Sequence, residues 1–99
     1  MVRFDVYRRN DGPGFLLDCQ ADVLGQLNTR LVVPLLPPTD GPKPISQLNP
    51  SFQIDGEQVV MFTQFAAAIP SRELEDRVAS LATEDRIVMN AFDMLLSGC

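Results

Sequence analysis

The chain has 99 residues, of which 45% are hydrophobic and 21% are charged, a composition typical of a soluble globular protein. This length predicts one domain that spans residues 1–99. Thirteen acidic residues outnumber eight basic ones and give a net charge of −5, whereas proteins that bind nucleic acid gain most of their affinity from basic residues. The charge balance therefore favours a protein partner over direct binding of nucleic acid.

The residue types exclude several kinds of site chemistry. The sequence has no histidine, which removes the commonest metal ligand and the usual general base. Cys19 and Cys99 match no metal-binding spacing, and Cys19 is expected to be a small buried residue in a reducing cytoplasm. No stretch approaches the ~20 apolar residues of a membrane span, and the first residues lack the apolar run of a signal peptide. We therefore expect a cytoplasmic protein that has no catalytic residues, no metal and no cofactor.

The N-terminal third of the chain predicts strands. Apolar and polar residues alternate over 2–7 and again over 15–21, and turn-forming residues occupy 10–14 between them. These two strands are expected to form a hairpin. A third strand is expected at 31–33 and should end at Pro34, because proline cannot donate to a sheet ladder.

The middle of the chain is less regular. Five of the eight prolines fall within 37–50, which predicts an irregular segment with at most a short strand near Ile45. The Asp55-Gly56 dipeptide suits a tight turn with positive φ, and the charged residues of 73–77 are expected to be solvated. Further strands are expected at 52–54, 59–62 and 65–69.

The pattern becomes helical at the C-terminal end, where Thr83 is the expected N-cap and Gly98 the expected stop. The apolar residues form two stripes, one of Ile87, Val88, Ala91, Met94 and Leu95, the other of Met89, Phe92 and Leu96. A helix that lies on a sheet needs one apolar face. The second stripe therefore predicts a core contact, a dimer contact or a partner surface. Four to six short strands followed by one helix predict a small β-barrel or curled sheet.

Several segments resemble, in the same order and spacing, those of the CcdB family of plasmid-type toxin–antitoxin modules. Phe4-Asp5-Val6-Tyr7 is similar to the Phe-Lys-Val-Tyr strand that opens the family sequence. The run Leu17-Asp18-Cys19-Gln20-Ala21-Asp22-Val23-Leu24 is similar to Val-Asp-Val-Gln-Ser-Asp-Ile-Ile. Further similar segments are Arg30-Leu31-Val32-Val33-Pro34-Leu35, Leu48-Asn49-Pro50 and the stretch from Glu84 to Ala91. The resemblance extends from residue 2 to residue 98.

This resemblance implies a mainly β fold, an SH3-like barrel with one C-terminal α-helix, and a homodimer. It also implies a toxin that is not an enzyme: the family poisons DNA gyrase by binding its A subunit and trapping it on cleaved DNA. A CcdA-like antitoxin neutralises such toxins through a disordered tail, so contact with DNA for transcription regulation is indirect and passes through the antitoxin.

The family's gyrase-binding residues carry over to Val23, Leu24, Asp93, Leu96, Ser97, Gly98 and Cys99. The family motif ends Phe-Trp-Gly-Ile, whereas this chain ends Leu96-Ser97-Gly98-Cys99. Tryptophan is a common hot-spot residue at interfaces, and serine offers almost no contact area. By area, the loss corresponds to about 3 kcal/mol, or about a hundredfold in affinity.

Residues Arg8, Arg9, Asn10 and Asp11 fall on the hairpin end that resembles the family's antitoxin-contacting loop, which is two residues longer than the loop here. Two adjacent arginines suit an acidic peptide, because charge-assisted hydrogen bonds to carboxylates are strong. A simply solvated turn is the alternative for this loop.

Three other functions remain open at this stage. The first is a CcdB-like protein with weakened or changed gyrase activity that is retained for antitoxin binding or co-repression. The second is a ribonuclease like the MazF-type toxins, which share the barrel. The last alternative is a small interaction module of another kind. The acidic charge and the lack of paired basic and hydroxyl residues argue against the ribonuclease.

Overall fold

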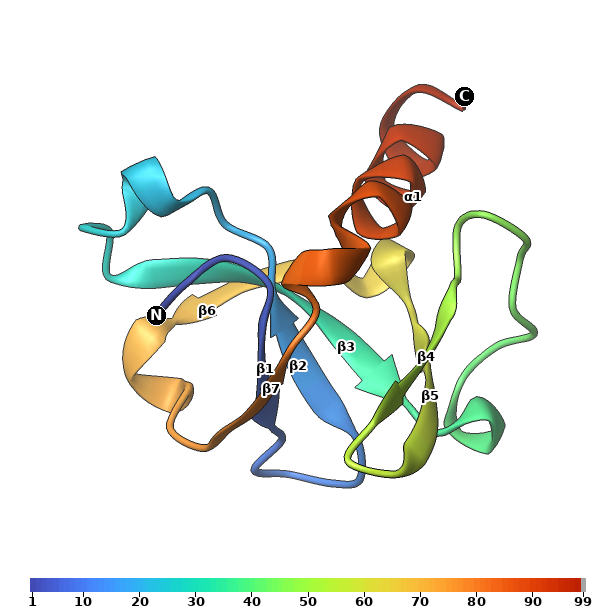
Figure 1. The fold of residues 1–99 in the computed structure, drawn as a ribbon, viewed down its shortest axis with the longest axis horizontal. Coiled ribbons are helices and arrows are strands. Elements are labelled where there is room, and N and C mark those ends of the chain that lie inside the picture. Colours follow the sequence, from blue (N-terminus) through green and yellow to red (C-terminus); the bar gives the residue numbers. More distant parts are fainter. Residues whose placement is uncertain (99) are drawn as a thin grey trace.

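Within residues 1–98, which the computed structural model describes, the chain forms a strongly curled, seven-stranded antiparallel sheet and one α-helix (Figure 1). The strands are β1 (Asp5–Arg8), β2 (Phe15–Asp18), β3 (Thr29–Leu36), β4 (Ser51–Ile54), β5 (Glu57–Met61), β6 (Ala67–Pro70) and β7 (Arg77–Ser80), and the helix is α1 (Asp85–Ser97). The strand order is β4-β5-β3-β2-β1-β7, and β6 pairs with β3. The expected mainly β fold with a C-terminal helix is confirmed, in the form of a half-barrel.

Strand β3 is the central strand and does not end at Pro34, so the expected boundary was wrong. One edge of β3 pairs with β2 over residues 32–35, whereas the other edge pairs first with β6 over 29–32 and then with β5 over 35–36. The carbonyl of Pro34 accepts a hydrogen bond from the Phe62 N–H on this second edge. The Pro34 nitrogen, which carries no hydrogen, faces this same edge of β3. It lies between the residues that pair with β6 and those that pair with β5. The sheet therefore tolerates a proline here although the strand is central.

Two glycines sit where the backbone requires them. Gly14 ends the loop of the β1–β2 hairpin with a φ of +97°, and a Cβ atom there would overlap the carbonyl oxygen of Leu35. Asp55 and Gly56 join β4 to β5 with φ values of 54° and 81°. The expected tight turn is therefore confirmed, with both residues in the left-handed region.

The structure corrects other expected strand boundaries. Residues 2–4 are not part of β1, and β2 ends at Asp18 rather than at residue 21. Between β3 and β4 the chain is irregular and forms no strand near Ile45, in agreement with the expectation. Strand β7 was not expected, because Arg77 was assigned to a solvated segment; it pairs with β1, and the Arg77 Nε lies 2.9 Å from Oδ1 of Asp5. Its four residues have no clear alternation, so only the pairing with β1 defines the strand.

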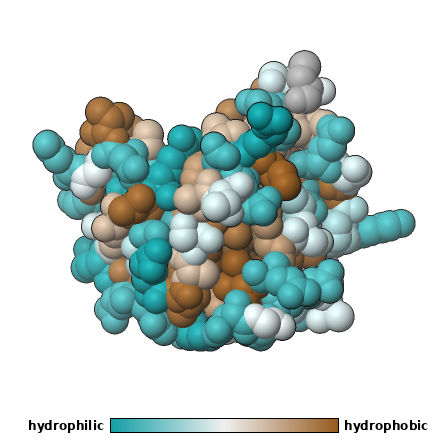
Figure 2. All heavy atoms as spheres, viewed as in Figure 1, coloured by the Kyte–Doolittle hydropathy of each residue, from teal (hydrophilic) through white to brown (hydrophobic). Residues whose placement is uncertain are grey.

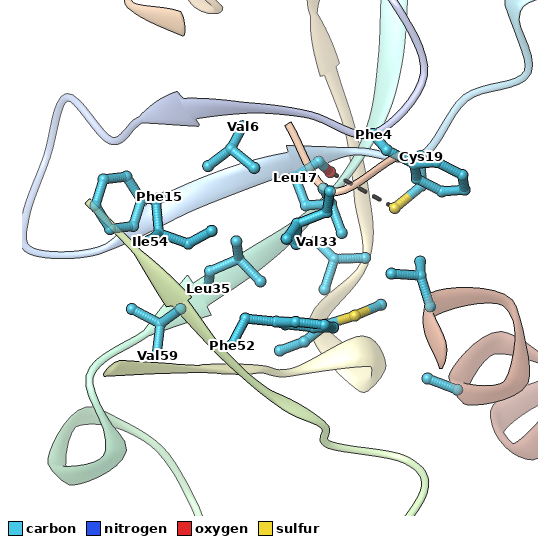
Figure 3. Close-up of a cluster of buried hydrophobic side chains, with 14 of the residues drawn as sticks. Phe4, Val6, Phe15, Leu17, Cys19, Val33, Leu35, Phe52, Ile54 and Val59 are labelled. Carbon is cyan, nitrogen blue, oxygen red and sulfur yellow. Dashed lines mark hydrogen bonds between the residues drawn. The ribbon is translucent and has the colours of Figure 1, made fainter. Parts of the chain in front are cut away.

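The core lies inside the curl of the sheet and under α1. Buried apolar side chains from β1 to β5 meet there, including Val6, Phe15, Leu17, Val33 and Ile54 (Figure 3). Cys19 is a free, buried thiol in the same cluster, as expected, and its Sγ lies 3.7 Å from the Leu17 carbonyl oxygen. The opposite face of the sheet carries two smaller apolar clusters.

Helix α1 begins one residue later than expected. A 3₁₀ turn, η5 (Ala82–Glu84), precedes it, and Glu84 occupies the N-cap position without a side-chain hydrogen bond. Thr83 is therefore not the N-cap. Gly98 ends the helix in the left-handed conformation, with its N–H donating to the Met94 carbonyl, as expected.

The buried side of α1 combines residues from both predicted stripes. Ile87 and Leu95, expected on the main buried face, are 45% and 40% exposed, and Leu96 is 78% exposed. The helix end therefore presents apolar side chains to solvent. The buried residues are Val88, Ala91 and Phe92.

No helix within residues 1–98 has the length and apolar content needed to cross a membrane.

Candidate functional site

Two projections rise from the same side of the molecule: the segment around the 3₁₀ turn η1 (Asp22–Leu24), and the C-terminal end of α1 (Figure 1). The space-filling view shows apolar atoms on both projections and a hollow between them (Figure 2). Val23 is 87% exposed, Leu24 is 48% exposed and Leu96 is 78% exposed. Exposed apolar side chains that gather on a small domain mark interaction surfaces. The structure thus places the apolar gyrase-contact candidates on two neighbouring projections.

The η1 segment is held by a buried glutamine. Gln20 is 9% exposed, and its Nε2 donates to the Leu24 carbonyl at 3.0 Å. Its Oε1 accepts a hydrogen bond from the Leu31 N–H on β3 at 3.2 Å. Both polar groups of the Gln20 amide are therefore used to fix the backbone that carries Val23 and Leu24. This lowers the ordering cost when the exposed side chains bind a partner.

A buried ion pair lies beneath this segment. The Arg30 Nε donates to Oδ2 of Asp18 at 2.9 Å, and the other carboxylate oxygen of Asp18 accepts the Gln20 N–H at 3.1 Å. In the alternation pattern, Asp18 and Gln20 fall on the same face as Leu16. That face is opposite the core face, so the pattern would place all three side chains in solvent. Sequence reasoning therefore missed both residues as supports of the site, although both lie within the segments that carry the family resemblance.

The other half of the candidate gyrase surface is the end of α1. Asp93, Leu96, Ser97 and Gly98 are all exposed, and the Ser97 hydroxyl donates to the Asp93 carbonyl at 2.9 Å. Nothing lies within 4 Å of the position that a Cβ atom would take at Gly98. A partner can thus approach the backbone closely at this end. Cys99, the last candidate, lies outside the described residues.

The four antitoxin-contact candidates lie together at the β1–β2 hairpin end, on a different part of the surface: Arg8 is the last residue of β1, and the other three follow it on the loop. The Arg8 guanidinium lies 3.5 Å from an Asp55 carboxylate oxygen and 3.3 Å from one of Asp76. Arg9 pairs with Asp11 at 3.3 Å, and Asn10 donates to the Glu73 carbonyl at 3.3 Å. Both arginines therefore already contact carboxylates of this chain. Exposed pairs of this kind contribute only about 0–1 kcal/mol each, so an incoming carboxylate displaces them at little cost.

A pocket of about 470 Å³ opens beside this loop. Arg9, Asn10, Asp11 and Glu73 line the rim, and the floor is formed by Phe65 and by apolar residues of β2, β3 and β6, among them Leu16 and Ile69. The combination of an apolar floor with one cationic and several polar groups at the rim suits an apolar side chain of a bound peptide. Sequence reasoning found the rim but not the floor, because the floor comes from Phe65 and three strands.

Two buried titratable groups, Cys19 and Tyr7, favour their neutral forms. Burial, with a smaller contribution from the Asp18 charge, raises the pKa of Cys19 from 9.0 to about 12. Burial also raises the pKa of Tyr7. The Cys19 thiol is therefore protonated at neutral pH and is a poor nucleophile. Among residues 1–98, the structure shows no group of three or more metal-ligating side chains suited to hold a metal ion.

Comparison with known protein families gives one match that covers essentially the whole chain. The family model described as CcdB protein matches residues 3–98. No individual curated protein matches the chain.

Proposed function

The chain belongs to the CcdB family, and we propose on this premise that it is the toxin of a toxin–antitoxin module and inhibits DNA gyrase by binding the A subunit. The observation that carries this proposal is the exposure of Val23, Leu24 and Leu96 on two neighbouring projections. By resemblance, the family's gyrase-binding positions carry over to all three. Because gyrase acts on DNA inside the cell, we place this activity in the cytoplasm.

The proposed mechanism is binding without a chemical step. Val23 and Leu24 on η1 and Leu96 on α1 supply apolar contact area, and Asp93 supplies a polar group beside Leu96. The fixed backbone of η1 keeps its two apolar side chains ready for the partner. Once bound, the toxin would hold the A subunit in the state in which both DNA strands are cut.

The test uses purified gyrase, supercoiled DNA and the purified protein, and it measures the amount of cleaved complex. The protein should increase cleaved DNA in a concentration-dependent way. Leu24→Asp and Leu96→Asp should each abolish this effect, because each places a charge in an apolar interface from which water is excluded. Ile45→Asp is the matched control, since Ile45 is 55% exposed and belongs to neither η1 nor α1. Equal activity in all three variants would contradict the proposed surface, and no RNA cleavage is expected from the same preparation.

A specific observation supports a second candidate function within the same family. Ser97 stands where the family has a tryptophan, and its hydroxyl bonds to the Asp93 carbonyl of its own helix. The contact area of an aromatic wedge is missing at this position. A CcdB-like protein with weakened gyrase binding, retained for antitoxin binding and co-repression, would therefore bind antitoxin without producing cleaved complex in the same assay.

We place the antitoxin site at Arg8, Arg9, Asn10 and Asp11 together with the adjoining pocket. The two guanidinium groups suit carboxylates of an acidic tail, and the apolar floor suits a hydrophobic side chain of the same peptide. The weak, exposed ion pairs of the loop are compatible with exchange of partners.

We also propose that the protein is a homodimer. Ile87, Leu95 and Phe65 are 45%, 40% and 49% exposed, so α1 and the adjacent turn η3 (Thr63–Phe65) offer apolar area that one chain leaves uncovered. Sedimentation at micromolar concentration should give twice the chain mass of 11.0 kDa. A species of 11.0 kDa alone would contradict the dimer.

A further inference from the structure

Arg3 contacts η1 and α1, the two elements that carry the candidate gyrase surface, and it meets α1 in the first half of the helix. Its backbone N–H donates to Oδ1 of Asp22, the first residue of η1, at 2.8 Å. Its guanidinium Nη2 lies 3.0 Å from the Met89 sulfur on α1, and its Nε lies 3.4 Å from the Cys19 carbonyl oxygen just before η1. One residue near the N-terminus thus joins two segments that are more than sixty positions apart in the sequence.

The backbone around Arg3 is fixed by an unusual conformation of the next residue. Phe4 is buried and has a φ of +72°, in a region that bulky residues rarely adopt. Its N–H donates to the Asp18 carbonyl, and its own carbonyl accepts the Leu81 N–H. The Arg3 guanidinium also lies over the Phe4 ring, 4.7 Å from the centroid. Strain of this kind persists only where the surrounding contacts determine the conformation, and it gathers at functional sites.

Other contacts hold η1 and α1 separately to the rest of the fold. Gln20 ties η1 to β3, and the buried face of α1 packs on the core through Val88, Ala91 and Phe92. These contacts hold each projection to the barrel, whereas Arg3 bridges the two. A partner that must touch both projections gains affinity when their separation is already set, because less freedom is lost on binding.

We propose that Arg3 is a positioning residue that holds η1 and α1 at a fixed separation, so that one partner surface engages Val23, Leu24 and Leu96 together. The gain in affinity that we expect from this role rests on the proposed gyrase-binding function. The bridge itself is a property of the free protein and is measured without a partner.

The first experiment measures amide hydrogen exchange at Leu24 and Gly25, whose N–H groups bond within η1 to the carbonyls of Ala21 and Asp22. Arg3→Ala keeps the backbone hydrogen bond to Asp22 but removes the guanidinium contacts with the Cys19 carbonyl and the Met89 sulfur. It should speed exchange at both amides by about tenfold, the effect of losing the hydrogen bond of a charged group. Met89→Leu, which keeps the volume of the side chain, should also speed exchange in η1, although Met89 lies on α1. Arg72→Ala, at an exposed arginine of η4 (Ser71–Glu73), is the control and should change neither amide.

The second experiment measures affinity for a gyrase A fragment by titration. Arg3→Ala and Met89→Leu should each raise the Kd by about five- to tenfold, and the double variant should raise it no further than the larger single effect. Urea unfolding of each variant separates this loss from global destabilisation, since a purely structural role would lower stability without the non-additive Kd.

The outcomes separate the two claims. If the unmodified protein does not bind gyrase, the proposed function fails, and the exchange data alone decide the positioning role. If the exchange of Leu24 and Gly25 is unchanged in both variants, or if the two Kd effects simply add, the positioning role is overturned even when gyrase binds.

Discussion

Asp18 and Arg30 form an ion pair that is almost completely shielded from water: Oδ2 of Asp18 lies 2.6 Å from Nη2 of Arg30, and the side chains are 0% and 1% exposed. The Arg30 Nε donates a hydrogen bond to the same oxygen, whereas Nη2 lacks the alignment for one. The second oxygen of Asp18 accepts the N–H of Gln20, whose side chain holds η1. The pair therefore connects the centre of the sheet to one half of the proposed gyrase surface.

Removal of one partner from this pair should be strongly destabilising. Asp18→Ala or Arg30→Ala leaves a buried charge without its counter-charge, which costs about 3–5 kcal/mol of the free energy of unfolding. The double variant Asp18→Leu, Arg30→Met should lose less than either single variant, because it leaves no buried charge. Urea unfolding measures all three. Asp11→Ala, which breaks the exposed pair with Arg9, is the control and should cost at most about 1 kcal/mol.

The Cys19 thiol should resist modification in the folded protein. With its pKa raised to about 12 by burial, the thiolate is scarce even at pH 8.5. In a Cys99→Ser background, an aromatic disulfide reagent should label Cys19 within minutes in urea and far more slowly without it. Comparable rates in the two conditions would show that Cys19 is accessible.

The same pKa predicts the direction of the pH dependence of stability. The native state keeps the Cys19 proton more tightly than the unfolded chain, whose thiol has the ordinary pKa of 9.0. The contribution of Cys19 to stability is thus fully present below about pH 9 and is lost as the pH rises toward about 12. Cys19→Ala should therefore lose less stability than the parent between pH 8 and pH 11, although it is less stable at pH 7.

Arg8→Ala, Arg9→Ala should weaken the antitoxin complex by about tenfold at low salt and flatten its dependence on salt concentration. The reason is the loss of two cations that would bind carboxylates of the antitoxin tail. Isothermal titration at two salt concentrations measures both effects. Arg72→Ala, Arg86→Ala removes the same charge elsewhere and should leave the affinity nearly unchanged. An unaltered affinity of the Arg8, Arg9 variant at low salt would assign this loop to a solvated turn.

Ser97→Trp, Cys99→Ile should increase the amount of gyrase trapped on cleaved DNA, with an affinity gain of up to about a hundredfold from restored contact area. Ser97 is exposed at the last position of α1, so substitution there should alter stability by about 0.5 kcal/mol or less. The cleavage assay compares the parent with the double variant. Strong poisoning by the parent would show that Val23, Leu24 and Leu96 suffice. An inactive variant would show that the target is not gyrase.

The sequence by itself determined the class of fold and several local features. Alternation between residues 2 and 62 indicated strands, Asp55-Gly56 indicated a tight turn, and Gly98 indicated the helix stop. These features depend on backbone preferences and side-chain periodicity over a few neighbouring residues, so no distant contact was needed to identify them. The whole-chain resemblance to one family was likewise visible in short segments, and the match over residues 3–98 confirms it.

The tertiary structure alone decided which polar residues support the site. Asp18, Gln20 and Arg30 have the residue types of a solvated strand face, yet they are buried because the segment around η1 covers that face of the sheet. Pro34 is in a central strand because the neighbour of β3 changes from β6 to β5 at that point. Arg3 gains its bridging position only when the end of the chain and its beginning are brought together. Burial and long-range pairing depend on the whole fold, and local sequence patterns do not carry that information.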